Sequence, residues 1–122
     1  MRISLIVDDS TVVRKVACRI FELLNFEARE AADAEEALEL CRSVMPDAIL
    51  VDGHLRPMSS TEFLSSLRDI ETDKRPVVIY CTSENDQGDI ARALSAGADD
   101  YVLKPFDREE IRSKLNAAGL PA

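Results

Sequence analysis

The sequence predicts an α/β protein in which helices cover both faces of a doubly wound parallel β-sheet. Five short apolar segments alternate along the chain with five segments whose apolar residues recur at the spacing of one helical face. Strands that alternate with helices in this way form parallel sheets through right-handed crossovers. The 122 residues suffice for a single domain with a self-sufficient core.

The five expected strands are apolar runs that are too short for typical helices. We place them at residues 3–7, 26–30, 48–51, 77–81 and 100–103. The second run alternates only weakly between apolar and polar side chains, which favours an edge strand. The third is uniformly apolar and includes β-branched Ile49 and Val51, which is typical of a strand buried on both faces.

The five expected helices begin at residues that cap helices and present one apolar face. Asp33 with Glu36, and Ser59 with Glu62, have the spacing of capping boxes. The other caps are Ser10 or Thr11 and Asp107, the fourth helix is expected from about Asp86 to Ala96, and the terminators are Asn25, Pro46 and Gly97. We expect these buried faces: Val13, Val16, Ala17, Ile20 and Leu24; Ala37, Leu38, Cys41, Val44 and Met45; Phe63, Leu64, Leu67 and Ile70; Ile90, Ala93 and Leu94; Ile111, Leu115 and Ala118.

Charge and composition exclude several classes of function. The net charge of −8 argues against direct binding of nucleic acid or an anionic membrane, because both need a basic surface. No apolar run approaches a membrane span, and the N-terminus has no signal peptide, so we expect a cytoplasmic protein. The odd, isolated cysteines Cys18, Cys41 and Cys81 fit buried thiols in a reducing compartment.

Polar residues follow four of the expected strands at their carboxyl ends. Asp8 and Asp9 follow the first strand, Asp52 the third, Thr82 the fourth and Lys104 the fifth. In a parallel sheet these ends meet at one edge, where ligands bind. Three carboxylates in one cleft repel one another unless a cation is bound, and an all-oxygen ligand set suits Mg²⁺. Alternatively, the first two acids only favour the amino end of the first helix.

Asp52 is a candidate nucleophile. A carboxylate can attack phosphorus to give an aspartyl phosphate. This reaction needs positive charge at the phosphoryl oxygens, which Mg²⁺ and Lys104 could supply. Thr82 could donate a hydrogen bond to a phosphoryl oxygen or simply cap the fourth helix. The alternatives without a catalytic role are that Asp52 is a solubilising loop carboxylate and that Lys104 is an ordinary surface charge.

These residues, with Tyr101 and the string AGADDYVLKPF at 96–106, resemble the receiver domain of two-component response regulators, in its CheY-like single-domain form. The resemblance covers essentially the whole chain. It implies the flavodoxin-like fold with five helices and the strand order 2-1-3-4-5, which is a known order for this fold.

The resemblance also implies a role for each site residue. It makes Asp52 the phosphoacceptor and Mg²⁺ the cofactor. The implied metal ligands are Asp8, Asp9, Asp52 and the backbone carbonyl of His54. Thr82 and Lys104 would hold the phosphoryl oxygens, Thr82 and Tyr101 would form the switch, and the Lys104–Pro105 peptide bond would be cis.

The chain departs from the family pattern after the phosphoacceptor. The usual Met-Pro pair is Leu55-Arg56, and the usual Asp-Gly that opens the third helix is Ser59-Ser60. We therefore expect a metal loop of altered shape or stiffness. His54 and Glu84 occupy positions that influence dephosphorylation in such domains, and we regard both as candidate modulators of phosphoryl lifetime.

The expected protein is a stand-alone receiver, residues 1–122, without an output domain. A sensor histidine kinase would donate phosphoryl to Asp52, and a downstream protein would bind the surface of helix four, strand five and helix five. We expect no enzymatic activity beyond self-phosphorylation and autodephosphorylation. Chemotaxis or motility is the expected pathway, and the alternative is a phosphate sink or relay intermediate for a shared kinase.

Three other functions compete with this one. An aspartyl-nucleophile phosphatase of the haloacid-dehalogenase type usually has Asp-x-Asp at the first strand and a cap domain. A flavin-binding domain would need a hydroxyl-rich phosphate loop and ring-stacking aromatics. A degenerate receiver would lack key side chains, but all five are present here.

Overall fold

Strands and helices alternate strictly along the chain, as predicted, in the computed structural model, which describes residues 1–122. The strands are β1 (Arg2–Val7), β2 (Phe26–Ala31), β3 (Ala48–Asp52), β4 (Val77–Thr82) and β5 (Asp100–Leu103). The helices are α1 (Thr11–Leu23), α2 (Ala34–Ser43), α3 (Ser60–Arg68), α4 (Gln87–Ala96) and α5 (Arg108–Ala117).

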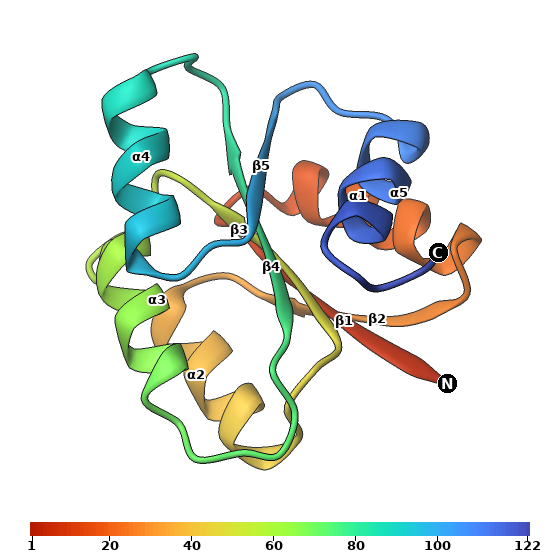
Figure 1. The fold of residues 1–122 in the computed structure, drawn as a ribbon, viewed down its shortest axis with the longest axis horizontal. Coiled ribbons are helices and arrows are strands. Elements are labelled where there is room, and N and C mark those ends of the chain that lie inside the picture. Colours follow the sequence, from red (N-terminus) through yellow and green to blue (C-terminus); the bar gives the residue numbers. More distant parts are fainter.

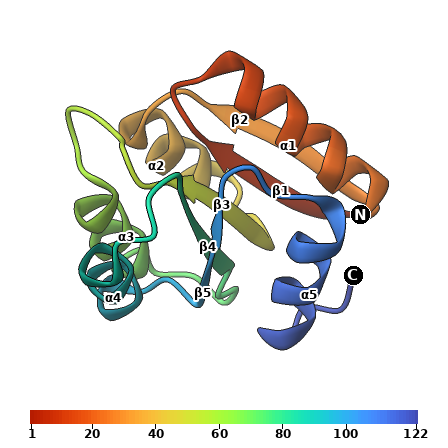
Figure 2. The ribbon, with the colours of Figure 1, turned by 90° about the horizontal axis from the view of Figure 1, so that it is seen from above.

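The five strands form one parallel sheet in the order β2-β1-β3-β4-β5, which confirms the order implied by the resemblance and the edge position of β2. Helices α1 and α5 cover one face, and α2, α3 and α4 cover the other (Figure 1). Figure 2 shows the same two layers from above. The register pairs Val7 with Val51, and Asp52 with Cys81, so the carboxyl ends of the central strands lie side by side.

The predicted capping residues occupy the helix starts. Ser10, rather than Thr11, caps α1. Ser59 and Glu62 form a reciprocal capping box at α3, whereas Asp33 accepts a bond from the Glu36 amide without a return bond from the Glu36 side chain. Asp107 caps α5 as predicted, and Asp86, predicted only as the approximate start of the fourth helix, caps α4. The terminators Asn25 and Gly97 adopt positive φ values of 69° and 132°, the conformation expected of them.

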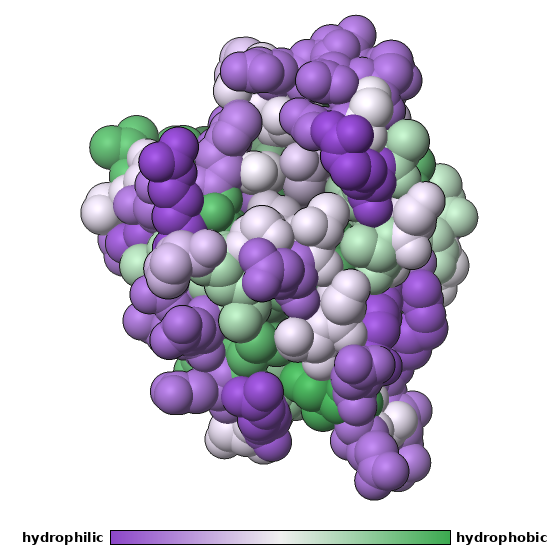
Figure 3. Space-filling view, turned by 90° about the vertical axis from the view of Figure 1, so that its left-hand side faces the viewer, coloured by the Kyte–Doolittle hydropathy of each residue, from purple (hydrophilic) through white to green (hydrophobic).

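The core forms two layers, one on each face of the sheet. One layer joins β1, β3 and β4 to α2, α3 and α4, and the other joins the same strands to α1 and α5. The outer surface over α3 and α4 is mostly hydrophilic, and its apolar areas are small and separated (Figure 3). No helix in the structure has both the length and the apolar character that crossing a membrane requires.

Four predicted core positions are wrong. Val16 and Leu94 are 51% and 41% exposed, Ala118 is exposed beyond the end of α5, and Val44 is 43% exposed because α2 already ends at Ser43. Phe21, which the prediction omitted, is instead fully buried against Phe26 with ring centroids 5.3 Å apart. Apolar spacing identifies the candidate residues of a helix, but the sheet decides which of them it covers.

The prediction of buried thiols is confirmed for two of the three cysteines. Cys41 and Cys81 are buried, whereas Cys18 is partly exposed. Burial raises the pKa of Cys18 and of Cys41 to about 11 and that of Cys81 to about 12. All three therefore remain protonated at neutral pH and have little nucleophilic character.

Candidate functional site

Asp8 and Asp52 stand side by side at the carboxyl ends of β1 and β3. The β1–β3 register aligns the residues that precede them, Val7 and Val51. Both aspartates are almost fully buried, at 3% and 4% exposure. The predicted convergence of carboxylates is therefore present for this pair.

Lys104 binds both carboxylates from the end of β5. Its Nζ atom lies 2.9 Å from Asp8 Oδ2 and 3.1 Å from Asp52 Oδ1. Its backbone amide donates to the Thr82 carbonyl at 2.8 Å, which extends the β4–β5 ladder by one residue and aims the side chain across the end of β4. Because its ammonium group binds two carboxylates, Lys104 is not a free surface charge.

The Lys104–Pro105 peptide bond is cis, as the resemblance implied. The Arg56–Pro57 bond is also cis, which was not predicted.

Asp9 completes a set of three carboxylates. Oxygen atoms of Asp8, Asp9 and Asp52 all lie within 4.8 Å of one another. Asp9 is exposed, and its side chain takes part in no hydrogen bond or ion pair within the protein. Its carboxylate is therefore free to bind a cation. The all-oxygen donor set fits Mg²⁺, which prefers such ligands and retains several waters.

Asp8 also accepts a hydrogen bond at the amino end of α1. The alternative interpretation, that the acidic pair favours the start of this helix, is therefore partly correct. Its Oδ1 atom accepts a hydrogen bond from the Ser10 amide at 2.9 Å. Its backbone carbonyl accepts a bond from Arg14 Nη1 at 2.7 Å, and Arg14 is itself paired with Glu30 at 3.0 Å. The helix start thus orients Asp8, while its other oxygen faces Lys104.

The buried carboxylates of the site favour positive charge beside them. Burial raises the pKa of Asp52, and the hydrogen bond from Lys104 only partly offsets this effect, so the pKa stays above its ordinary value. Burial lowers the pKa of Lys104, but its bonds to Asp8 and Asp52 outweigh burial and leave the pKa raised. Lys104 is therefore an ammonium at neutral pH, and an added cation would relieve the remaining repulsion between the carboxylates.

Thr82 ends β4 next to this cluster. It is buried, and its Oγ1 atom accepts a bond from the Glu84 amide at 3.2 Å. Its hydroxyl hydrogen remains available, since the hydroxyl makes no bond to Asp52. Asp86, not Thr82, caps α4, which excludes the capping alternative for Thr82.

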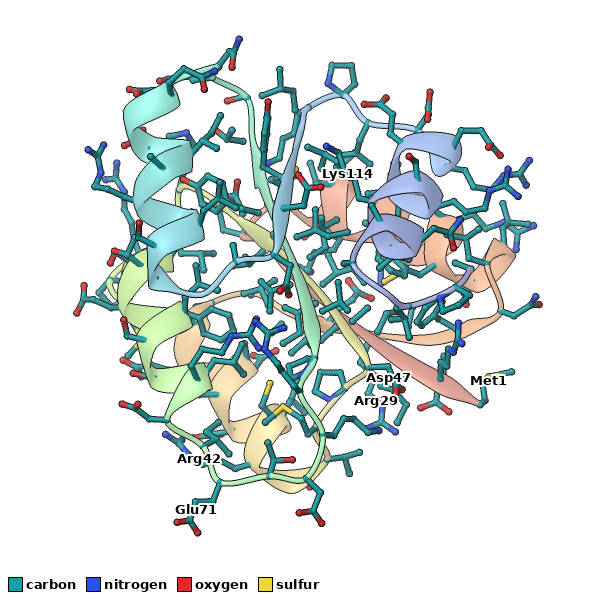
Figure 4. The ribbon with its side chains drawn as sticks, viewed as in Figure 1. Met1, Arg29, Arg42, Asp47, Glu71 and Lys114 are labelled. Atoms are coloured by element: carbon teal, nitrogen blue, oxygen red, sulfur yellow. The ribbon has the colours of Figure 1, made fainter.

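Tyr101 and Lys114 form a contact between β5 and α5. The ring of Tyr101 is half-buried, and Lys114 Nζ lies 5.1 Å from its centroid. Lys114 also binds Asp100 Oδ1 at 3.1 Å, so its chain lies along the gap between β5 and α5 (Figure 4). This cation–π contact was not predicted, because it depends on the packing of α5.

His54 and Glu84 are exposed at the rim of the site. The positive form of His54 lowers the pKa of Asp52, although less than Lys104 does. Glu84 contributes its backbone amide to Thr82. Neither side chain makes a hydrogen bond within the protein, so their roles in phosphoryl lifetime stay predictions.

The sequence-based prediction missed two residues that support Asp52 from behind. Ser60, which stands where the family usually has glycine, donates from Oγ to the Asp52 carbonyl at 2.6 Å. Tyr80 lies on β4 beneath the loop that follows Asp52. The departure at Ser60 was visible in the sequence, but its bonding partner was not.

The comparisons with known proteins agree with this geometry. A family model described as the response regulator receiver domain matches residues 4–116. Protein CcdB of Bacillus subtilis is 35% identical over 109 residues, which are 88% of each chain. The crystal structure of chemotaxis protein CheY4 of Vibrio cholerae has a TM-score of 0.89 to this chain at 26% identity, and the match covers 97% of this chain and 98% of that one.

A longer relative is also similar. The phosphate regulon transcriptional regulatory protein PhoB of Escherichia coli is 31% identical over 113 residues, which are 93% of this chain. The chain spans about half the length of PhoB, 49%. The similarity to PhoB is therefore to one part of that protein.

Proposed function

Because the chain belongs to the response regulator receiver domain family, we propose that it accepts a phosphoryl group on Asp52 in the presence of Mg²⁺ and signals through altered protein binding. The observation that carries the proposal is the bridge from Lys104 to both Asp8 and Asp52 at 2.9 and 3.1 Å. The bridge places a fixed positive charge beside the one carboxylate that lies in the middle of the sheet edge.

Asp8, Asp9 and Asp52, with the backbone carbonyl of His54, would hold Mg²⁺. The fit rests on the three mutually close carboxylates and on the unpaired side chain of Asp9. When bound, Mg²⁺ neutralises negative charge on the phosphoryl oxygens. Asp8 is oriented by Ser10 and Arg14 before any ion arrives, which lowers the cost of assembling the site.

In the proposed transfer, one oxygen of Asp52 forms a bond to phosphorus while the bond from phosphorus to the donor breaks. The donor atom is a histidine nitrogen of a sensor kinase or the carboxyl oxygen of acetyl phosphate, and it leaves with the bonding electron pair. Lys104 exchanges its bond to Asp52 for a bond to a phosphoryl oxygen. Thr82 donates its free hydroxyl hydrogen to another phosphoryl oxygen.

The proposed signal leaves the site through β5 and α4. The phosphoryl group adds charge and hydrogen-bond acceptors in a buried place. Thr82 moves toward them, and Tyr101 turns into the space left behind, away from Lys114. The surface of α4, β5 and α5 then changes its affinity for a partner, by a shift between states that are already accessible.

An apolar groove beside the site suits a phosphodonor kinase. It has a volume of about 310 Å³ and is lined by Val12, Val13, Val16, Lys104, Pro105 and Phe106. Val12 and Val16 are 73% and 51% exposed, so these two valines are not part of the hydrophobic core. Since Lys104 lines both the groove and the phosphoacceptor site, a kinase that delivers phosphoryl to Asp52 would cover this groove, and its burial would favour docking.

We further propose a stand-alone, motility-type receiver in the cytoplasm, without enzymatic activity on other substrates. The support is the match over 98% of CheY4 and 88% of CcdB, together with the fact that CheY4 is a chemotaxis protein. A phosphate sink or relay intermediate is the alternative. Phosphoryl return from the phosphorylated protein to a kinase, without a phosphorylation-dependent binding partner, would favour this alternative.

The test is intact mass measured after incubation with acetyl phosphate and Mg²⁺. The proposal predicts the gain of one phosphoryl group, which is absent with EDTA and absent in Asp52→Asn. Asp47→Asn is the matched control, because Asp47 lies at the opposite ends of β1 and β3, where it binds the Ile3 amide at 2.8 Å (Figure 4). Unchanged mass, or steady phosphate release from many small phosphate esters, would overturn the proposal.

A further inference from the structure

Gly53 is glycine because of Tyr80 and not because of its backbone conformation. Its φ lies outside the left-handed region, so other residues could adopt it. A Cβ atom at Gly53, however, would lie 2.5 Å from the Tyr80 hydroxyl oxygen, 2.9 Å from Cζ and 3.4 Å from Cε1. Real Cβ atoms do not approach other atoms to 2.5 Å, and a buried ring cannot move aside cheaply.

The strand geometry explains the close approach. Gly53 continues the pairing of β3 with β4, because its amide donates to the Cys81 carbonyl at 2.8 Å. Successive residues of a strand face opposite sides of the sheet, so Gly53 faces the side opposite to Asp52. Tyr80 lies on that same side, in the core layer under α2, α3 and α4. The end of its ring thus supports the first residue of the metal loop from below.

The tyrosine also connects this loop to α4. A cavity of about 180 Å³ lies beside the tyrosine and is lined by Gly53, His54, Ser59, Tyr80, Asp89 and Arg92, among others. Tyr80 is 6% exposed, and its hydroxyl makes no hydrogen bond within the protein. Burial and the carboxylates of Asp89 and Asp52 raise its pKa, so the phenol stays neutral and acts by contact.

We infer that Tyr80 is a positioning residue for the metal site: its ring sets the height of the β3–α3 loop and therefore the place of the His54 carbonyl next to Asp52. This inference rests on the proposed function, since it concerns the same Mg²⁺ site. Ser60 acts together with Tyr80, because its bond to the Asp52 carbonyl holds the start of the same loop. The β3–α3 loop, whose sequence departs from the family pattern, is thus supported by Tyr80 from β4.

The test measures Mg²⁺ affinity by calorimetry in four proteins: wild type, Gly53→Ala, Tyr80→Leu and the double variant. Gly53→Ala should weaken Mg²⁺ binding by about tenfold or more, the usual effect of disturbing an outer support of a metal site. The double variant should bind more tightly than Gly53→Ala alone, because leucine leaves room for the new methyl group. Gly88→Ala is the matched control, since its Cβ would meet only the ends of flexible side chains, at 3.2 Å or more.

Unfolding by urea in EDTA separates positioning from stability. A purely structural contact would lower stability and leave the Mg²⁺ affinity of the folded protein unchanged, which would overturn the inference. The inference would also be overturned if the loss of Mg²⁺ affinity in the double variant equalled the product of the losses in the two single variants. If Gly53→Ala does not fold, the Mg²⁺ affinity of Tyr80→Leu decides: weaker binding than in wild type supports the inference, and unchanged binding contradicts it. Failure of wild type to bind Mg²⁺ would instead reject the proposed function.

Discussion

Asp52 is a residue whose function conflicts with stability. Burial, repulsion from Asp8 and the bond from Lys104 together leave its pKa above the ordinary value. The folded state therefore disfavours the carboxylate relative to the unfolded chain. Well below about pH 4 the group is protonated in both states, and the penalty is absent. The penalty grows as pH rises above the ordinary pKa and is complete once pH exceeds the raised pKa.

Asp52→Asn should therefore stabilise the protein. In EDTA at neutral pH we expect the free energy of unfolding to rise by about 1–3 kcal/mol, because the amide is neutral and Lys104 keeps its bond to Asp8. The gain should shrink toward zero as pH falls to about 3. Urea titrations at several pH values measure it. Asp107→Asn, at an exposed helix cap where both residues serve equally, should show no such gain. A pH-independent gain would contradict the explanation.

The site residues were predictable to different degrees. Asp8, Asp52 and Lys104 follow apolar strands, and parallel topology brings such positions together, so the sequence was enough to predict their meeting. Tyr80 and Ser60 act through contacts with the backbone of residues 52 and 53. Apolar patterning says that Tyr80 is buried, but the atom that its ring touches depends on the packing of β4 against a loop.

At the scale of elements, α4 is anchored at its carboxyl end. Arg68 on α3 donates to the Gly97 carbonyl at 2.6 and 3.1 Å and to the Pro76 carbonyl at 3.0 Å. It also pairs with Asp99 at 3.2 Å. One guanidinium thus ties the end of α4 to α3 and to the start of β4, whereas the amino end of α4 is held by its Asp86 cap.

Arg68→Lys should destabilise the protein by about 1–3 kcal/mol, because a single ammonium cannot replace a planar group that binds three acceptors. Unfolding by guanidinium chloride measures the change in the free energy of unfolding. Arg112→Lys is the control: Arg112 pairs on the surface with Glu109 and should change stability by less than about 0.5 kcal/mol. Equal effects of the two substitutions would show that the anchor contributes nothing.

The elements themselves were largely predictable, because local chemistry determines them. Ser59 with Glu62, Asp107 and Gly97 act within a few residues of the chain, and the structure has them in the predicted roles. The faces of the helices were less predictable. Val16 and Leu94 keep the apolar spacing but remain exposed, and only the packed structure shows which residues of a helix are covered.

At the scale of the whole molecule, Mg²⁺ should act as a stabiliser. An ion that binds only the folded protein raises the free energy of unfolding, by about 2.7 kcal/mol at one hundred times its dissociation constant. Thermal unfolding with Mg²⁺ and with EDTA measures this effect. Asp9→Asn should abolish it, because Asp9 is the free carboxylate of the cluster, while Asp73→Asn, in the loop before β4, should retain it. Equal stabilisation of both variants would indicate non-specific screening.

The central claim of this account is that one carboxylate among three accepts phosphorus. The most direct test is to label the protein with acetyl phosphate and Mg²⁺, reduce the acyl phosphate with borohydride and sequence the peptides by mass spectrometry. The account predicts a single reduced residue, at position 52, and none in EDTA. Reduction at position 8 or 9, or at no aspartate, would contradict it.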